Sequence, residues 1–392
     1  MRTNLIISTD IGTDIDDAVA LYIAANSPNI DLHGVYVTNG PVVDRAYIAK
    51  HMLNLCGKDA LVAVGESDAV YTQERHYTTG AEKASVPRKK HRLDILHGWM
   101  DAMAKQLERV PDMVVASIAP LTNFSVLLDK MPKAAKRIKT LYIMGGREGH
   151  NEHNFTHDTR AAQRVLTSKM NLVVVPADVC SRFECDIELL TGLDDSPAQR
   201  YLAHMAGLWK LYKDLGADGC LSSNSSFLRS FKERSHVPSA AKGREGMERE
   251  LDEHKHFKLW LGMLCHGKNF CDEPNQHLHL YRMIRDWLKV NRNRLPYAKE
   301  WLDHMEANGM KSTRVSDAFV IYAIEHPEKI EEKRVTLSCD KRGNMAVNEG
   351  DRHRLVTDVD YKHFAAYLKR RLEQKPQRKR IKPGPKPRMI QR

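Results

Sequence analysis

The chain has 392 residues, of which 28% are charged and 42% are hydrophobic, and this is the composition of a globular protein. It has no run of eighteen apolar residues, and Asp10 interrupts its apolar start, so we expect no membrane span, no secretory signal and a cytoplasmic location. Seven cysteines without a CxxC pair favour reduced thiols and argue against a disulfide framework.

The net charge of +11 is concentrated at the C-terminus. Residues 369–392 carry eleven Lys or Arg and one acid, which leaves 50 basic and 49 acidic side chains in the first 368 residues. Prolines and a glycine among these basic residues predict a disordered tail. Two functions fit such a tail: a solvated, solubilising terminus, or non-specific contact with RNA, DNA or another polyanion.

The first half of the chain alternates short apolar strands with helices. We predict a strand at residues 5–7, a helix that ends at Ser27-Pro28, a strand at 32–38 and a helix closed by Gly57. Further apolar runs predict strands at residues 61–64, 113–118, 140–144 and 172–175, with helical segments between them. Such an alternation predicts an α/β fold with a largely parallel sheet covered on both faces.

The alternation fades after Asp178, and we predict a helical insertion over about residues 193–312. The predicted elements that follow are a helix at 315–324, short strands around 334–338 and a helix over 360–372. The insertion holds a group of candidate zinc ligands and a group of aromatic residues: Cys265, His266, Cys271, His277 and His279, and Trp260, Tyr281 and Trp287. The Cys/His spacing matches no common zinc finger, so we interpret that group as packed or surface residues, and we expect the aromatic residues in a helical cap.

Acidic side chains gather where the first strand ends. Four of them, Asp10, Asp14, Asp16 and Asp17, fall within eight residues, and ligands of parallel sheets bind at the carboxyl ends of the strands. Four carboxylates would repel one another without a cation, and calcium or magnesium prefers such oxygen ligands. Helix capping accounts for one or two of these acids, but it predicts no matching acid at Asp317. The sequence therefore predicts a metal site.

Six motifs resemble, in the same order, those of the nucleoside hydrolase family, the inosine/uridine-preferring nucleoside hydrolases. They are TDIGTDIDDAVAL (residues 9–21), TNG (38–40), APLTN (119–123), MGG (144–146), EHNFTHDTRAA (152–162) and SDA (316–318). The resemblance implies a Rossmann-like, mixed and mostly parallel sheet with helices on both faces. It also implies a hydrolase that cleaves the N-glycosidic bond of purine or pyrimidine ribonucleosides, gives ribose and free base, and uses one Ca²⁺ ion.

The same resemblance implies a role for each matching residue. It makes Asp10, Asp17 and Asp317 carboxylate ligands of calcium and Thr122 a ligand through its backbone carbonyl, and Asp10 would take the proton from the attacking water. The implied substrate-binding residues are Asp16 and Asn39 for the ribose hydroxyls, and Met144, Glu152 and Asn154 for the ring and its 5′ side. Asp10, Asp16, Asn39 and Asn154 form the predicted catalytic set. The family also suggests a homodimer or homotetramer, although the insertion could block those contacts.

The sequence departs from the family pattern at three points. The first motif has two extra residues, so Asp14 competes with Asp16 for the ribose-binding role, and Ser8 replaces the leading acid. Ser316 stands where purine-cleaving members have a histidine that is proposed to protonate the leaving base. Candidate substitutes for that acid are His76, His153, His157 and a histidine of the insertion.

We therefore expect residues 1–368, with the insertion at about 193–312, to form a nucleoside hydrolase-like domain, and residues 369–392 to form the basic tail. Ser316 and the large insertion also fit an NAD or ADP-ribosyl glycohydrolase. A non-enzymatic alternative is an inactive family member that binds ribose or a polyanion. The intact set of predicted site residues argues against that alternative, because a binding protein does not need a water-activating acid.

Overall fold

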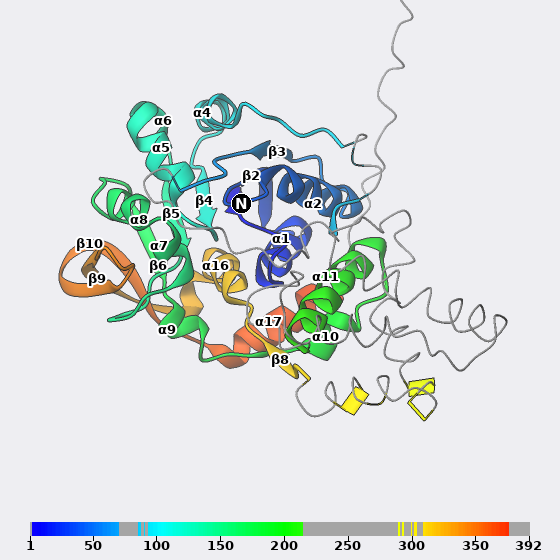
Figure 1. The fold of residues 1–392 in the computed structure, drawn as a ribbon. Coiled ribbons are helices and arrows are strands. Elements are labelled where there is room, and N and C mark those ends of the chain that lie inside the picture. The colour runs from blue at the N-terminus through cyan, green and yellow to red at the C-terminus, as the bar shows by residue number, and fades with distance from the viewer. Residues whose placement is uncertain are drawn as a thin grey trace, which may run out of the picture.

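The computed structural model describes residues 2–69, 85–87, 90, 93–214, 289–290, 292–293, 299, 302–303 and 309–375 (Figure 1). Several predictions lie outside these residues. They concern most of the insertion after Asp214, with its candidate zinc ligands and its aromatic group, and also His76 and the tail after Lys375.

One eight-stranded sheet forms the centre of the described structure, in the order β3-β2-β1-β4-β5-β6-β10-β9. All neighbouring strands are parallel except β10 and β9, which pair antiparallel. The strands are β1 (Thr3–Thr9), β2 (Ile30–Val37), β3 (Leu61–Val64), β4 (Val114–Ser117), β5 (Thr140–Met144), β6 (Leu172–Val175), β9 (Ile330–Cys339) and β10 (Met345–Val359); β7 (Cys185–Asp186) and β8 (Ser312–Thr313) form a separate antiparallel pair. The predicted mixed, mostly parallel sheet is confirmed.

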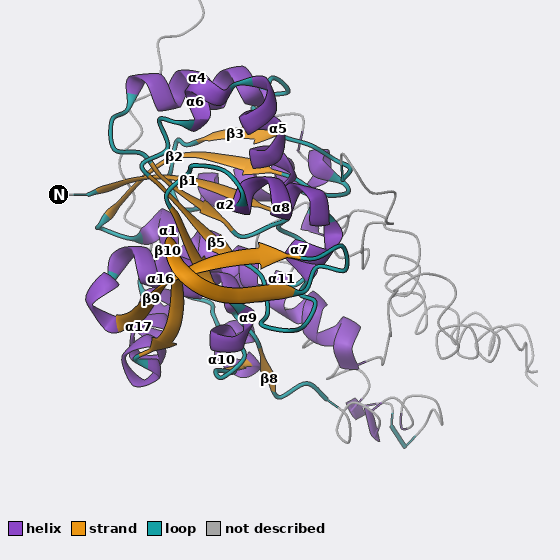
Figure 2. Ribbon diagram, turned by 90° about the vertical axis from the view of Figure 1, so that its left-hand side faces the viewer, coloured by secondary structure: helices purple, strands orange, loops and turns teal. Residues whose placement is uncertain are grey.

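Helices cover both faces of this sheet (Figures 1 and 2). One layer contains α1 (Asp16–Asn26), α2 (Val42–Leu55), α11 (Pro197–Asp214), α16 (Ser316–Glu325) and α17 (Tyr361–Glu373). The other contains α4 (Trp99–Arg109), α5 (Thr122–Lys130), α6 (Pro132–Ala135), α7 (His153–His157) and α8 (Thr159–Leu166). Short α9 (Ala177–Cys180) and α10 (Ile187–Thr191) follow β6, and a 3-10 turn, η2, spans Pro327–Lys329.

The pleat of the strands divides the core into two layers. In β1, Leu5 and Ile7 belong to the apolar cluster beneath α1 and α16, whereas Ile6 belongs to the cluster beneath α5 and α8. All three side chains are fully buried. Because both faces of a central parallel strand are covered, the strand is a continuous apolar run and shows no polar alternation.

The hairpin of β9 and β10 is longer than the sequence predicts. The predicted strand around residues 334–338 lies inside the ten-residue β9, and the fifteen-residue β10 was not predicted. β9 begins with four consecutive exposed and charged residues after Ile330, so it lacks the continuous apolar run by which the buried strands are recognised.

The C-terminal helix α17 packs against α16 through a buried ion pair. Arg371 Nη2 lies 2.7 Å from Glu325 Oε1, and the two side chains are 6% and 1% exposed. Leu372 is fully buried as well. The predicted boundary between residues 368 and 369 therefore falls inside a packed helix. Among the described helices, none has both the length and the apolar character needed to cross a membrane.

Candidate active site

The strand order reverses between β1 and β4, which is the place where open α/β sheets form a ligand crevice. A cleft of about 600 Å³ opens there. The predicted site residues that line it are Asp10, Asp16, Asp17, Met144, Glu152, Asn154 and Asp317. Further lining residues include Asp14, Ile118, Arg147, Asn151, His153, Glu184, Trp209, Lys213, Met310, Arg314 and Ser316. The topology thus brings most of the predicted site into one cavity.

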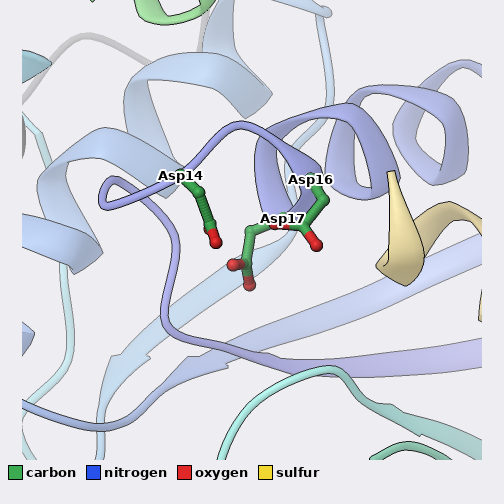
Figure 3. A group of neighbouring side chains, drawn as sticks. All are labelled: Asp14, Asp16 and Asp17. Atoms are coloured by element: carbon green, nitrogen blue, oxygen red, sulfur yellow. The ribbon is translucent and has the colours of Figure 1, made fainter. Parts of the chain in front are cut away.

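The acidic end of the cleft is built from the start of two helices. Asp14 lies in the loop before α1, and Asp16 and Asp17 lie in its first turn; one carboxylate oxygen of each is within 4.8 Å of the others (Figure 3). Asp317 lies in the first turn of α16, which packs against α1. Residues about 300 positions apart in the sequence are therefore neighbours, because the two helices share one layer.

Burial and mutual repulsion raise the pKa values of Asp16, Asp17 and Asp317. For Asp16, Asp17 and Asp317, burial is the largest cause of the raised pKa, and the neighbouring carboxylates add to it. The Oδ1 atom of Asp16 is buried and has no hydrogen-bond partner among the residues that the structure describes. A cation bound among these buried carboxylates would relieve their mutual repulsion.

Three hydrogen bonds orient the carboxylates at the end of β1. The hydroxyl of Thr9 and the amide of Asp10, the latter at 3.2 Å, donate to Asp17 Oδ1. The side-chain amide of Asn39 donates to Asp10 Oδ2 at 2.8 Å. Asn39 has a φ of 67°, a left-handed conformation that asparagine tolerates better than most residues. Asn39 therefore lies behind Asp10 and fixes its side chain.

Arg45 on α2 is a site residue that sequence reasoning missed. Its fully buried guanidinium donates to the carbonyls of Asp10, Ile11 at 3.0 Å and Asn39 at 2.6 Å, and to the Thr13 hydroxyl at 3.0 Å. These bonds hold the loop that carries the acids. The sequence does hold one signal that could have identified Arg45. It is a basic residue three positions after Val42, on the apolar side of the helix, where a core residue is expected.

Glu152, Asn154 and Met144 form the second part of the predicted site. Glu152 accepts hydrogen bonds from the amides of Gly146 at 2.8 Å, Asn154 at 3.0 Å and Phe155 at 3.2 Å. The side-chain amide of Asn154 donates to the Met144 carbonyl at 3.1 Å. Burial raises the pKa of Glu152, and the three amide bonds oppose that shift. These hydrogen bonds thus fix the loop after β5 against the start of α7.

The glycine pair of the MGG motif permits this close packing. Gly146 has a φ of 79°, and a Cβ atom there would lie 2.7 Å from Met345 Sδ and 2.9 Å from Phe155 Cε2. Only glycine fits both the left-handed backbone and the contact.

Two predicted residues, Asn39 and Thr122, are not among those that line the cleft. Asn39 supports Asp10, as described above. The hydroxyl of Thr122 donates to Asp158 Oδ2 at 2.9 Å, which ties the start of α5 to the start of α8. The role of the Thr122 carbonyl as a metal ligand stays a prediction.

The candidates for protonating the leaving group also have defined places. Ser316 lines the cleft, and its carbonyl accepts a hydrogen bond from Cys180 Sγ at 3.7 Å. His153 lines the cleft and is exposed, whereas His157 is buried below it. Asp14 lines the cleft beside Asp16, so both remain candidates for the ribose-binding role.

The donor set fits a hard divalent cation. Five aspartates, one buried oxygen without a partner and no sulfur or imidazole ligand in the acidic group match the preferences of calcium or magnesium.

Comparison with known sequences identifies similar proteins of one family. The family model of the inosine-uridine preferring nucleoside hydrolases matches residues 5–242. An uncharacterised protein of Schizosaccharomyces pombe is 29% identical over 211 residues, which are 49% of this chain and 67% of that protein. A pyrimidine-specific ribonucleoside hydrolase of Escherichia coli is 24% identical over 208 residues, 49% of this chain and 65% of that enzyme. The chain thus matches about two thirds of the length of these curated relatives.

Solved structures share the fold. A plant nucleoside hydrolase superposes with a TM-score of 0.62 at 15% identity, covering 95% of this chain and 99% of the other. A purine-preferring ribonucleoside hydrolase from Gardnerella vaginalis gives a TM-score of 0.59 at 14% identity, covering 95% and 98%. Because the family model matches more than half of the chain and includes five of the six motifs, the chain belongs to the inosine-uridine preferring nucleoside hydrolase family.

Proposed function

We propose that this protein is a calcium-dependent hydrolase that cleaves the N-glycosidic bond of a ribonucleoside or a related N-riboside. The observation that carries the proposal is the convergence of Asp10, Asp16, Asp17 and Asp317 at the strand-order reversal, in a cleft that also contains Glu152 and Asn154. Family membership supports the reaction class. The cleft volume of about 600 Å³ suits a small ligand of nucleoside size.

Asp10, Asp17, Asp317 and the carbonyl of Thr122 would hold the cation. When bound, it would lower the pKa of a water molecule and fix the ribose hydroxyls near it. A 2′-deoxy substrate would lose part of this attachment, so we expect it to react more slowly.

Asp10 is the proposed general base. Its Oδ2 accepts the hydrogen bond from Asn39, which holds the carboxylate toward the cleft and keeps its orientation during proton transfer. Arg45 holds the Asp10 backbone at the same time. The base is therefore fixed through both its side chain and its main chain. Such positioning accounts for a large part of the rate enhancement of enzymes.

Asp16, Glu152 and Asn154 are the proposed groups around the sugar. Cleavage of a C–N glycosidic bond passes through an oxocarbenium-like sugar, so negative and dipolar groups around the ring stabilise the transition state. Because three backbone amides bind Glu152, its carboxylate is held in place before the substrate arrives.

The test is a substrate panel of purine and pyrimidine nucleosides and NAD, with and without a calcium chelator, read as free ribose, base or nicotinamide. We expect ribose release that the chelator abolishes. Asp10→Asn should lower kcat by about 10²–10⁴-fold, which is typical of a lost general base. Asp31→Asn is a matched control, because the Asp31 side chain is 60% exposed on β2 and outside the cleft.

Each outcome separates the alternatives. Release of nicotinamide without cleavage of any nucleoside would favour the NAD glycohydrolase. If the calcium-loaded protein releases no base from any N-riboside, the protein is a binding member of the family and the proposed activity is wrong. Full activity of Asp10→Asn would remove Asp10 as the base.

We further propose that the catalytic unit extends through α17, because Arg371 and Leu372 are buried in it. The basic residues after this helix would then supply only non-specific attraction to polyanions. Retention on heparin at low salt tests this attraction, and light scattering tests the homo-oligomer that the family resemblance suggests.

A further inference from the structure

The cleft carries cationic side chains that hydrolysis of a neutral nucleoside does not use. Arg147 follows β5, Lys213 lies in the last turn of α11, and Arg314 precedes α16. Arg314 is exposed and the Arg147 side chain is 50% exposed, whereas Asp17 and Asp317 are each only 3% exposed. The most buried acids therefore occupy one end of the cleft, and its exposed part carries these three cations together with one acid, Glu184. A ligand that spans both would be neutral or hydroxylated at one end and anionic at the other.

Arg147 has the geometry of a prepared anion-binding residue. Its backbone is fixed, because its carbonyl accepts hydrogen bonds from the amides of His150 at 3.2 Å and Met345 at 3.3 Å. Among the described residues its side chain makes one ion pair, from Nε to Asp178 Oδ1 at 3.9 Å, and no hydrogen bond. The other oxygen of Asp178 accepts the Glu148 amide at 3.0 Å. The terminal guanidinium nitrogens of Arg147 thus remain available to a ligand in the cleft.

The position of Arg147 indicates which part of the substrate it would meet. It directly follows Gly146, whose amide donates to Glu152. Glu152 and Asn154 are the residues proposed to hold the 5′ side of the ribose, so Arg147 borders that side of the site. A 5′-hydroxyl needs no cation. A 5′-phosphate does, and the planar guanidinium binds two phosphate oxygens at once.

We propose that the substrate is an N-riboside that carries a 5′-phosphate and that Arg147 binds this phosphate. The proposal rests on the N-riboside hydrolase activity proposed above and deepens it. The phosphate could belong to a nucleoside 5′-monophosphate or to a dinucleotide, and both share the group that Arg147 recognises. Lys213 and Arg314 add positive charge on the open side of the cleft, where the rest of a longer phosphate chain would lie.

The first test measures binding of ribose and of ribose 5-phosphate to the wild-type protein in calcium-containing buffer, by calorimetry. Neither ligand has a base to lose, so the result does not depend on turnover. We expect ribose 5-phosphate to bind about tenfold tighter or more, the range expected for one charge-assisted contact. Arg147→Ala should abolish most of this difference, and Arg147→Lys should keep part of it, because lysine retains the charge but not the paired donors.

Arg164→Ala is the matched control, because Arg164 pairs with Asp129 on the surface at 2.7 Å, away from the cleft. It should leave the binding ratio at its wild-type value. Equal affinities for ribose and ribose 5-phosphate in the wild type would overturn the proposal. So would an equal loss of both affinities in Arg147→Ala, because that result indicates a structural role.

The second test compares kcat/KM for uridine, uridine 5′-monophosphate and NAD. We expect kcat/KM for at least one of the two phosphorylated compounds to exceed kcat/KM for uridine. The ratio of these two kcat/KM values should fall about tenfold or more in Arg147→Ala. Preference for the monophosphate or for NAD identifies the source of the phosphate. If uridine is cleaved best and Arg147→Ala leaves the ratio unchanged, the phosphate proposal fails and the hydrolase proposal stands. If no compound releases its base while ribose 5-phosphate still binds through Arg147, the hydrolase proposal fails, and of the second proposal the phosphate-binding role of Arg147 stands.

Discussion

At the scale of single residues, the geometry of the acidic site depends on one buried arginine, Arg45. Arg45 has no exposed surface, and its donors bind the backbone on both sides of the sheet edge, at Asp10 and Ile11 after β1 and at Asn39 after β2. Its charge also lowers the pKa of Asp17, against the larger effect of burial. Arg45 is therefore a positioning residue, since it acts on the site through the loop that carries the acids.

We predict that Arg45→Met lowers the free energy of unfolding by about 2–5 kcal/mol, because it leaves several buried carbonyls without donors. It should also lower kcat by at least about tenfold, since a small displacement of a catalytic group costs much of its rate. Urea unfolding and steady-state kinetics measure the two effects. Lys50→Met is the control: Lys50 is buried on the same helix but donates to the Ala60 carbonyl at 3.1 Å. If both variants lose kcat equally, the positioning role of Arg45 is wrong.

At the scale of elements, His353 is one of the residues that join the edge of the sheet to the helix layer. His353 on β10 is buried; its Nδ1 accepts the Leu337 amide of β9 at 2.9 Å, and its Nε2 lies 3.0 Å from the Leu166 carbonyl of α8. Because Nδ1 is an acceptor, the ring hydrogen is on Nε2, which donates to Leu166. The hydrogen bonds of the folded protein thus require the neutral imidazole.

We predict a pH-dependent stability from His353. Burial, with the charge of Arg352, lowers the pKa of His353 from 6.5. Below that value the unfolded chain binds a proton that the folded protein excludes, so the stabilisation present at neutral pH is lost as the pH falls. Urea unfolding of wild type and His353→Gln between pH 5 and 8 isolates this contribution as a difference. The exposed His97→Gln should keep the wild-type slope, and an identical slope in His353→Gln would contradict the prediction.

At the scale of the whole molecule, α1 and α16 converge because both of their ends are fixed. At their C-terminal ends, Glu325 accepts hydrogen bonds from Ser27 at 2.5 Å, from Tyr367 at 2.5 Å and from Arg371 at 2.7 Å. At their N-terminal ends the buried acids face one another. The positive ends of the two helix dipoles offset part of the repulsion. The fold therefore supplies the energy that holds carboxylates together until a cation binds.

We predict that calcium raises the melting temperature, because it binds the folded acids and relieves their repulsion. Calcium at a hundred times its Kd should stabilise the fold by about 2.7 kcal/mol, which is several degrees for a domain of this size. Asp317→Asn should reduce this gain, and the exposed Asp31→Asn should not. Thermal unfolding in calcium, magnesium and chelator measures the effect. Equal melting temperatures in all three would show that the cluster does not bind a divalent cation.

The sequence by itself determined the parts of this protein that depend on local pattern. The buried strands are continuous apolar runs, and the residues after them carry the family motifs, so both the sheet and the list of acids could be predicted. The same local reasoning could not predict β10, whose exposed and charged residues form a strand only because β9 and β6 pair with it.

Tertiary structure decided which residues share the cleft. Arg45, Arg147 and Trp209 carry no local signal of function, because their roles arise from neighbours distant in the sequence. Trp209 donates to Thr313 at 3.1 Å across about a hundred residues, and α11 thereby becomes a wall of the cleft. Burial raises the pKa values of Asp16, Asp17 and Asp317, because packing removes the water that stabilises a charged carboxylate. The sequence determined which chemical groups are present, and packing determined how close together they lie and how deeply they are buried.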